Sequence, residues 1–131
     1  MIVRIAPHQL AAQSMHEAGE LARDGLLVGL IVANRSLAQM AAAVDAIENI
    51  GSLDQDGITK PITLVAASAA KGLEFDAVVV VEPSAIAGSD ARGLRMLYVA
   101  MTRPIRRLTI VHAEPLPLQL RQGEPESDLE I

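Results

Sequence analysis

Four consecutive valines at 78–81 follow Ala77 and complete an uninterrupted apolar run. A continuously apolar strand suits a parallel sheet that helices cover on both faces, because the strands of a half-exposed antiparallel sheet alternate apolar and polar residues. Four more apolar segments have strand length: 2–6, 26–33, 62–67 and 108–112. Segments with helical periodicity lie between them, at 8–23, 36–49 and 91–102. This alternation predicts an α/β domain with a mainly parallel sheet.

The 131 residues suit one domain with its own core. There is no cysteine and no apolar run of the roughly 18 residues that a membrane span needs, so we expect no membrane association and a reducing, cytoplasmic setting. The net charge of -5, with one Phe and one Tyr, leaves the chain by itself without the basic surface or aromatic platform of an autonomous nucleic-acid-binding module.

The composition also predicts where the chain is ordered. We expect residues 1–114 to form the folded domain and the acidic, proline-rich segment 115–131 to be a flexible tail. Within the domain, the polar segment 51–61 predicts a linker, and 83–93 predicts a flexible loop that could order on contact with a partner.

Several charged residues adjoin the predicted strands, and ligands of an open parallel sheet bind beyond the carboxyl ends of its strands. Pro104 favours a turn after Arg103, which predicts that the Arg103 guanidinium projects from the surface. Because guanidinium groups match phosphate oxygens bidentately, we expect a phosphate-selecting rim. The residues concerned are Lys71, Gly72 and Glu74 after the strand at 62–67, Arg35 after the strand at 26–33, and Arg103 at the end of the third helix.

Each of these residues also has a purely structural interpretation. Arg103 could complement the dipole of its helix, and Arg35 could start a helix that Ser36 caps. The string "KGLEF" could be a turn with Gly72 at positive φ. No G-x-x-x-x-G-K-[ST] motif occurs, so the chain lacks a P-loop of its own.

Other polar residues predict no metal site. Glu82 ends the valine run as a magnesium-binding acid would, but without a phosphate cradle we expect a solvated acid at a strand end. His8 and His16 are separated by about 12 Å along a helix, too far to share a metal. His112 has no neighbouring cysteine or second histidine.

Two strings carry a resemblance to a known family. "AAKGLEFDAVVVV" (69–81) and "LRMLYVAMTRPIRRLTIV" (94–111) together resemble the last two conserved motifs of UvrD/Rep-like superfamily-one helicases. "NRSLAQ" (34–39) is similar to the family's fourth motif, Y-R-S-N-A-Q. The resemblance covers about residues 25–115, with motif-like segments 34–39, 66–76 and 94–104. It implies the second, three-layer RecA-like domain of such a motor, with ATP and Mg²⁺ held mainly by a first RecA-like domain of the same parent chain.

The resemblance also implies roles for individual residues. Arg103 would be the arginine finger, with Arg35 as its companion at the γ-phosphate. The nucleotide would be contacted by Gly72 and Glu74 as well as by both arginines, with Glu74 near the ribose. Coupling to nucleic acid, most simply single-stranded DNA, would involve Lys71, Ser68 and Thr102. The isolated domain would show no ATPase activity.

The sequence departs from the family pattern in three places. Asn34 replaces a tyrosine, Ser68 and Ala69 replace His-Ser, and Arg92 and Gly93 replace acidic residues. The strings "FDAVVVVEP" and "TRPIRRLTIVHAEPLP" are most similar to HelD-type proteins, a branch that binds RNA polymerase. Two functions stay open: a motor domain acting on DNA or on a polymerase complex, and a non-catalytic RecA-like domain that binds a protein partner.

Overall fold

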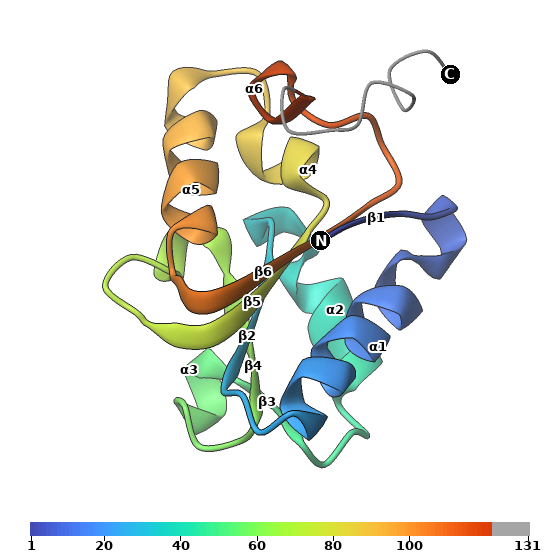
Figure 1. Cartoon of the computed structure of the whole chain (residues 1–131), viewed down its shortest axis with the longest axis vertical. Coiled ribbons are helices and arrows are strands. Elements are labelled where there is room, and N and C mark those ends of the chain that lie inside the picture. Colours follow the sequence, from blue (N-terminus) through green and yellow to red (C-terminus); the bar gives the residue numbers. More distant parts are fainter. Residues whose placement is uncertain (122–131) are drawn as a thin grey trace.

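A computed structural model describes residues 1–121 of the chain and contains a single six-stranded sheet (Figure 1). The strand order is β1-β6-β5-β2-β4-β3, and every pair of neighbouring strands is parallel. The α/β fold with a mainly parallel sheet is therefore confirmed. The strands are β1 (Ile2–Arg4), β2 (Val28–Val32), β3 (Ile50–Ser52), β4 (Ile62–Ala66), β5 (Phe75–Val81) and β6 (Pro104–His112).

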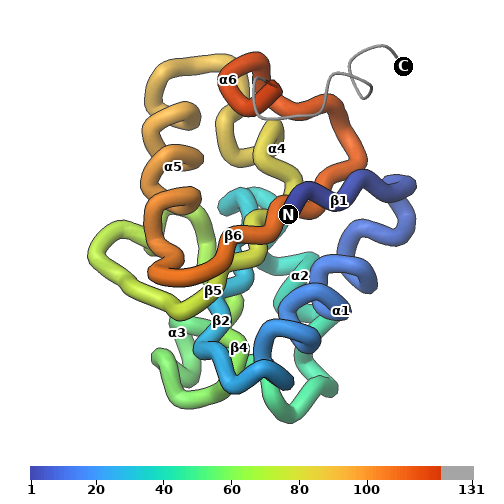
Figure 2. Tube along the Cα trace, in the orientation of Figure 1, coloured from blue at the N-terminus to red at the C-terminus, as the bar shows by residue number. Residues whose placement is uncertain are grey.

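Helices cover both faces of the sheet, as Figure 1 shows for α1 and α2 on one side and α4 and α5 on the other. The α-helices are α1 (Leu10–Arg23), α2 (Leu37–Val44), α3 (Leu53–Asp56), α4 (Pro83–Ala87), α5 (Ala91–Met101) and α6 (Leu118–Arg121). Three short 3-10 helices precede or follow strands: η1 (Pro7–Gln9), η2 (Asn34–Ser36) and η3 (Ala67–Ala69). The chain trace in Figure 2 follows the same three layers. None of the helices within residues 1–121 has the length and apolarity to span a bilayer.

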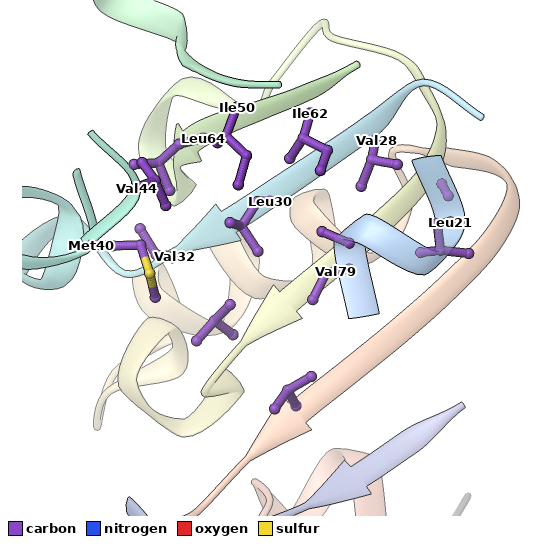
Figure 3. Close-up of a cluster of buried hydrophobic side chains, with 14 of the residues drawn as sticks. Leu21, Val28, Leu30, Val32, Met40, Val44, Ile50, Ile62, Leu64 and Val79 are labelled. Carbon is purple, nitrogen blue, oxygen red and sulfur yellow. The ribbon is translucent and has the colours of Figure 1, made fainter. Parts of the chain in front are cut away.

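The valine run supplies both halves of the core. Val79 and Val81 pack in a cluster with α1 and α2, whereas Val78 and Val80 pack in a second cluster with α4 and α5. This division follows from the pleat, since successive side chains of a strand point to opposite faces. Figure 3 shows the first cluster, with Leu21 of α1 near the strand residues. At about 1.5–3 kcal/mol for each fully buried valine, the run contributes strongly to stability.

Two segments that the sequence predicts as irregular are ordered. Residues 51–61 contain the end of β3 and all of α3, so the predicted linker is wrong. Gly51 is buried, and its lack of a side chain leaves room for the Asp56 carboxylate, which accepts a hydrogen bond from the Ser52 backbone N–H at 3.0 Å. Residues 83–93 form α4 and the first turn of α5, so the predicted flexible loop is also wrong. Burial of Ile86 in the second cluster holds this segment on the sheet.

The end of the domain lies further along the chain than the sequence predicts. Leu116 is buried in the second cluster, and α6 follows it. Residues 122–131, the larger part of the predicted tail, lie outside the described residues. The flexibility of that tail therefore stays a prediction.

A glycine in β2 makes room for the one phenylalanine of the chain. A Cβ atom on Gly29 would lie 2.6 Å from the ring of Phe75, well inside van der Waals contact. The pairing of β5 with β6 shifts register between Phe75 and Ala77, and the carboxylate of the intervening Asp76 accepts a hydrogen bond from the Leu27 backbone N–H at 2.8 Å. Together these contacts fix the start of β5, which immediately follows the "KGLE" segment.

Candidate functional site

The two predicted arginines lie at opposite ends of the strands. Arg35 is in η2, just beyond the carboxyl end of β2. Arg103 directly precedes β6, whose first residue pairs with the first residue of β5. The seven residues of β5 span about 20 Å, so a single phosphate-selecting rim is a wrong prediction. The reason is that α5 returns the chain from the carboxyl ends of the strands to their amino ends before Arg103 is reached.

The guanidinium of Arg103 is hydrogen-bonded within the domain. Its Nε donates to the Val99 carbonyl at 3.0 Å, and one Nη donates to the Leu73 carbonyl at 3.4 Å. The other Nη donates to Thr102 Oγ1 at 3.4 Å. The prediction of a freely projecting guanidinium is therefore wrong, because the unpaired carbonyls at the C-terminus of α5 attract a cation. The half-buried side chain is nevertheless at the surface and can be reached.

Thr102 ends α5 and adds to this polar group. Its hydroxyl is within 3.0 Å of both the Tyr98 and Val99 carbonyls and can donate to either. The Arg103 carbonyl accepts a hydrogen bond from the Phe75 backbone N–H at 3.4 Å. The end of α5 is thus tied to the segment that precedes β5, and two motif-like strings separated in the sequence meet here.

The "KGLE" turn presents charges to solvent. Gly72 has φ +85°, a conformation that favours glycine, and a Cβ atom there would contact nothing. Its smallness therefore serves the backbone turn rather than an internal close approach. Lys71 and Glu74 are exposed, and neither side chain has a hydrogen bond or ion pair within residues 1–121. Glu74 directly follows Leu73, whose carbonyl accepts the hydrogen bond from Arg103.

A second polar group lies at the carboxyl ends of β2 and β4. Asn34 Nδ2 donates to Ser68 Oγ at 2.8 Å, and the Ser68 backbone N–H donates to Asn34 Oδ1 at 3.1 Å. Arg35, next in the chain, is exposed and has no side-chain partner in the described part of the chain. Residues 68–73 therefore connect the two groups, with one end bonded to Asn34 and the other to Arg103.

Gly93 explains one departure from the helicase pattern. A Cβ atom on this buried residue would lie 1.9 Å from the Ala87 carbonyl oxygen. Asp90 caps α5 by accepting a hydrogen bond from the Gly93 N–H at 2.8 Å. An acidic side chain at 93 could not fit between α4 and α5, whereas Arg92 beside it is exposed.

Glu82 has a structural role that the sequence does not reveal. Its half-buried carboxylate accepts hydrogen bonds from the backbone N–H groups of Ala113, at 3.0 Å, and Glu114, at 3.2 Å. The predicted solvated acid is therefore wrong. Its partners follow β6 and lie 31 and 32 residues along the chain, so no local sequence pattern predicts the contact.

The histidines occupy different environments. His8 and His16 are exposed, and His112 is buried with Nδ1 at 2.8 Å from the Glu114 carbonyl. Within residues 1–121 there is no group of three or more His, Cys, Asp or Glu side chains that could hold a metal ion. The sequence-based prediction that ATP and Mg²⁺ bind with the help of another domain is left open by this structure.

Comparison with known proteins concerns the same part of the chain. Residues 64–111, from β4 into β6, match the family of the UvrD-like helicase C-terminal domain. The C-terminal domain of a possible DNA helicase from Lactobacillus plantarum WCFS1 has a similar structure, with a TM-score of 0.76 and 21% sequence identity, over 94% of this chain and 78% of that chain. No curated protein matches the sequence. The structural similarity confirms the three-layer RecA-like fold, here without a P-loop in the sequence.

Proposed function

We propose that the chain is the second RecA-like domain of an ATP-dependent DNA helicase or translocase. The match of residues 64–111 to a helicase C-terminal domain family supports this proposal. The observation that carries it is the hydrogen bond from Arg103 to the Leu73 carbonyl, because this contact joins the two segments that the helicase resemblance assigns to ATP hydrolysis.

In this proposal Arg103 is an arginine finger that acts on ATP held between two domains. Its guanidinium exchanges neutral carbonyl partners for charged phosphate oxygens, and charge-assisted hydrogen bonds are roughly twice as strong as neutral ones. The hydrogen bonds to the Val99 and Leu73 carbonyls hold the Arg103 side chain against its own domain until the two domains close. In this proposal Glu74 accepts a hydrogen bond from a ribose hydroxyl, and Gly72, with φ +85°, allows the turn that precedes it.

The remaining ATP contacts are proposed to lie on a first RecA-like domain of the parent chain, which would supply the P-loop. Mg²⁺, when bound there, neutralises phosphate charge during hydrolysis. Arg35 lies at the other ends of the strands, so its role as a companion at the same γ-phosphate stays a sequence-based prediction.

Residues 68–73 are proposed to couple ATP to nucleic acid. When Arg103 moves to the phosphate, the Leu73 carbonyl loses its partner, and the turn containing Lys71 is free to shift. Ser68, at the other end, is bonded to Asn34 at the carboxyl ends of β2 and β4, where a single strand of DNA is proposed to bind. Thr102 can follow the same movement because its hydroxyl contacts Arg103.

A finer proposal concerns the partner of the motor. The similarity of "FDAVVVVEP" and "TRPIRRLTIVHAEPLP" to HelD-type proteins supports RNA polymerase as a target of the parent protein. ATPase assays of the full-length parent, with single-stranded DNA and with RNA polymerase added separately, distinguish the two cases. Stimulation by DNA alone favours a conventional helicase, whereas dependence on polymerase favours remodelling of a polymerase complex.

The decisive experiment is Arg103→Ala in the full-length parent. We expect ATP turnover to fall about 10³-fold or more, the magnitude typical of an arginine finger, while ATP binding changes only slightly. Arg103→Lys should not restore turnover, because lysine lacks the planar bidentate group. Arg95→Ala, which removes an exposed arginine of the preceding helix α5, is the matched control. Normal turnover by Arg103→Ala would overturn the proposal, as would ATP hydrolysis by the 131-residue chain alone.

A second candidate is a non-catalytic domain that binds a protein partner. It is favoured by a groove of about 390 Å³ beside α5 and α6, lined by apolar residues that include Leu94, Leu97 and Met101. Tyr98, also in this groove, is 71% exposed, which is unusual for a large aromatic side chain. If this candidate is correct, Tyr98→Ser abolishes partner binding by the parent protein and Arg103→Ala has no effect on its activity.

A further inference from the structure

A cavity of about 390 Å³ lies at the carboxyl ends of β2 and β5. After β2 the chain continues toward β4 and β3, and after β5 it continues to β6 on the opposite side. The connections that follow these two neighbouring strands therefore leave in opposite directions, which makes the gap between β2 and β5 the topological switch point of the sheet. Open α/β sheets bind ligands at such a switch point. The cavity is separated from Arg103 by the length of the strands.

The cavity has an apolar floor. Val32 and Val81 end the two strands, and Met40 of α2 and Leu10 of α1 complete the surface. Figure 3 shows Met40 close to Val32 at one end of the first core cluster. A ligand with a compact apolar or aromatic body would therefore be accommodated.

The rim of the cavity is rich in hydrogen-bond donors. Arg35, Ser36 and Gln39 contribute a guanidinium, a hydroxyl and an amide from η2 and α2, and His8 contributes an imidazole from η1. The guanidinium has no partner within residues 1–121. The acidic residue of the wall is Glu82, whose carboxylate already accepts hydrogen bonds from two backbone N–H groups. The free groups therefore favour an anion.

The wall of the cavity is also strained. Glu82 has φ +53°, and it is the one non-glycine residue with positive φ in the described part of the chain. Such conformations cost on the order of 1–3 kcal/mol and cluster at ligand sites. The bonds to Ala113 and Glu114 hold Glu82 in this conformation, so the shape of the cavity is fixed before any ligand enters.

We propose that this cavity binds a small organic phosphate, with the phosphate on Arg35 and the apolar body on Val32, Met40 and Val81. Phosphate is preferred to carboxylate because the several donor side chains of the rim match three terminal oxygens better than two. A nucleoside monophosphate has the required chemistry. The site is separate from the proposed ATP site, since Arg103 lies at the other ends of the strands. It adjoins the Asn34–Ser68 pair, where a single strand of DNA is proposed to bind.

The test uses AMP as the probe and the isotope-labelled 131-residue chain in low salt. We expect AMP to shift the NMR resonances of Arg35, Ser36 and Gln39, and adenosine to bind at least about tenfold more weakly, since it lacks the charged group. Arg35→Ala should weaken AMP binding by a similar factor, whereas Arg95→Ala on the other face should leave it unchanged. Equal binding of adenosine, or AMP shifts confined to residues 72–75 and 102–104, would overturn the proposal.

A pair of substitutions at Ala43 tests the sign of the charge. Ala43 is exposed, lies in α2 and lines the cavity, and both Glu and Lys are good helix formers. Ala43→Lys should tighten AMP binding and Ala43→Glu should weaken it, each by a fewfold factor that shrinks as salt is raised. The site would be refuted if both substitutions changed the AMP affinity in the same direction, or if the unsubstituted chain did not bind AMP. ATPase loss in Arg103→Ala has no bearing on either outcome, so the two proposals fail separately.

Discussion

The side chain of Asn34 is hydrogen-bonded twice to Ser68, as donor to its hydroxyl at 2.8 Å and as acceptor from its backbone N–H at 3.1 Å. Both residues depart from the helicase pattern, in which a tyrosine and a histidine are usual. The two departures are therefore spatially paired. Asn34 and Ser68 join the carboxyl ends of β2 and β4 by hydrogen bonds, at positions where the family pattern has the aromatic side chains of tyrosine and histidine.

This pairing predicts energetic coupling. In the 131-residue chain, Asn34→Ala and Ser68→Ala should each reduce the free energy of unfolding, and the double variant should lose less than the sum. We expect a coupling energy of about 0.5 kcal/mol, the low end for a hydrogen-bonded pair, because both side chains are exposed. Urea denaturation of the four proteins measures it. Strict additivity would mean that the pair is not formed in solution.

The contact between Gly29 and Phe75 gives a second prediction. Gly29→Ala should destabilise the chain by about 1–3 kcal/mol, because the new Cβ would lie 2.6 Å from the buried ring. Phe75→Leu in the same chain should recover part of the loss, since the smaller side chain leaves room for the methyl group. Urea denaturation of the single and double variants measures both effects.

Gly19 is the matched control for this substitution. It lies within α1, and a Cβ atom added there would have no neighbouring atom within 4 Å, so Gly19→Ala should stabilise the chain by about 0.5–1 kcal/mol through helix propensity. If Gly29→Ala were as stabilising as Gly19→Ala, the close packing of Phe75 on β2 would be refuted.

The fold was largely predictable because its strongest signal is local. A run of valines buried on both faces requires helices above and below, and the intervening helical segments supply them. The short elements β3, α3 and α4 were not predictable, since they are too short to show a periodic pattern of apolar residues. They are held by individual contacts, such as the hydrogen bond between the Ser52 N–H and the Asp56 carboxylate. The exact register of β5, set by Asp76 and Leu27, likewise depends on a contact distant in sequence.

A buried hydroxyl in β4 gives a third prediction. Thr63 is fully buried, and its Oγ1 has no hydrogen-bond partner in the described structure. Thr63→Val keeps the shape and removes the unsatisfied group, so we expect stabilisation of about 1 kcal/mol. Thr63→Ser keeps the hydroxyl and loses the methyl group, and should destabilise. Thermal or urea unfolding of both variants checks the signs, and a destabilising Thr63→Val would show that the hydroxyl has a partner in solution.

The candidate site was predictable residue by residue but not as an arrangement. Sequence spacing identified Arg35, Gly72, Glu74 and Arg103, yet it placed both arginines on one rim. Their separation depends on β6 running parallel to β5, because α5 must then return the chain from the carboxyl ends of the strands to their amino ends. The cavity beside Arg35 was missed for a similar reason, since its walls come from η1, α2 and the ends of two strands that are distant in sequence.

The start of α5 gives the last prediction, which concerns the acidic residues that the family pattern has near 92 and 93. Gly93→Ala should destabilise the chain by about 3 kcal/mol or more, because the Cβ would lie 1.9 Å from the Ala87 carbonyl oxygen and two helices must separate. Helix propensity alone would give the opposite sign, by about 1 kcal/mol, so the direction of the change is informative.

An acid at the neighbouring position provides the contrast. Arg92 is exposed in the first turn of α5, where a negative charge is favoured by the helix dipole, so Arg92→Glu should be neutral or stabilise the chain by about 0.3–1 kcal/mol. Gly93→Asp should be at least as damaging as Gly93→Ala. Urea denaturation of the three variants tests this order. If Gly93→Asp were tolerated as well as Arg92→Glu, α4 and α5 would not pack as closely as the Gly93 contact requires.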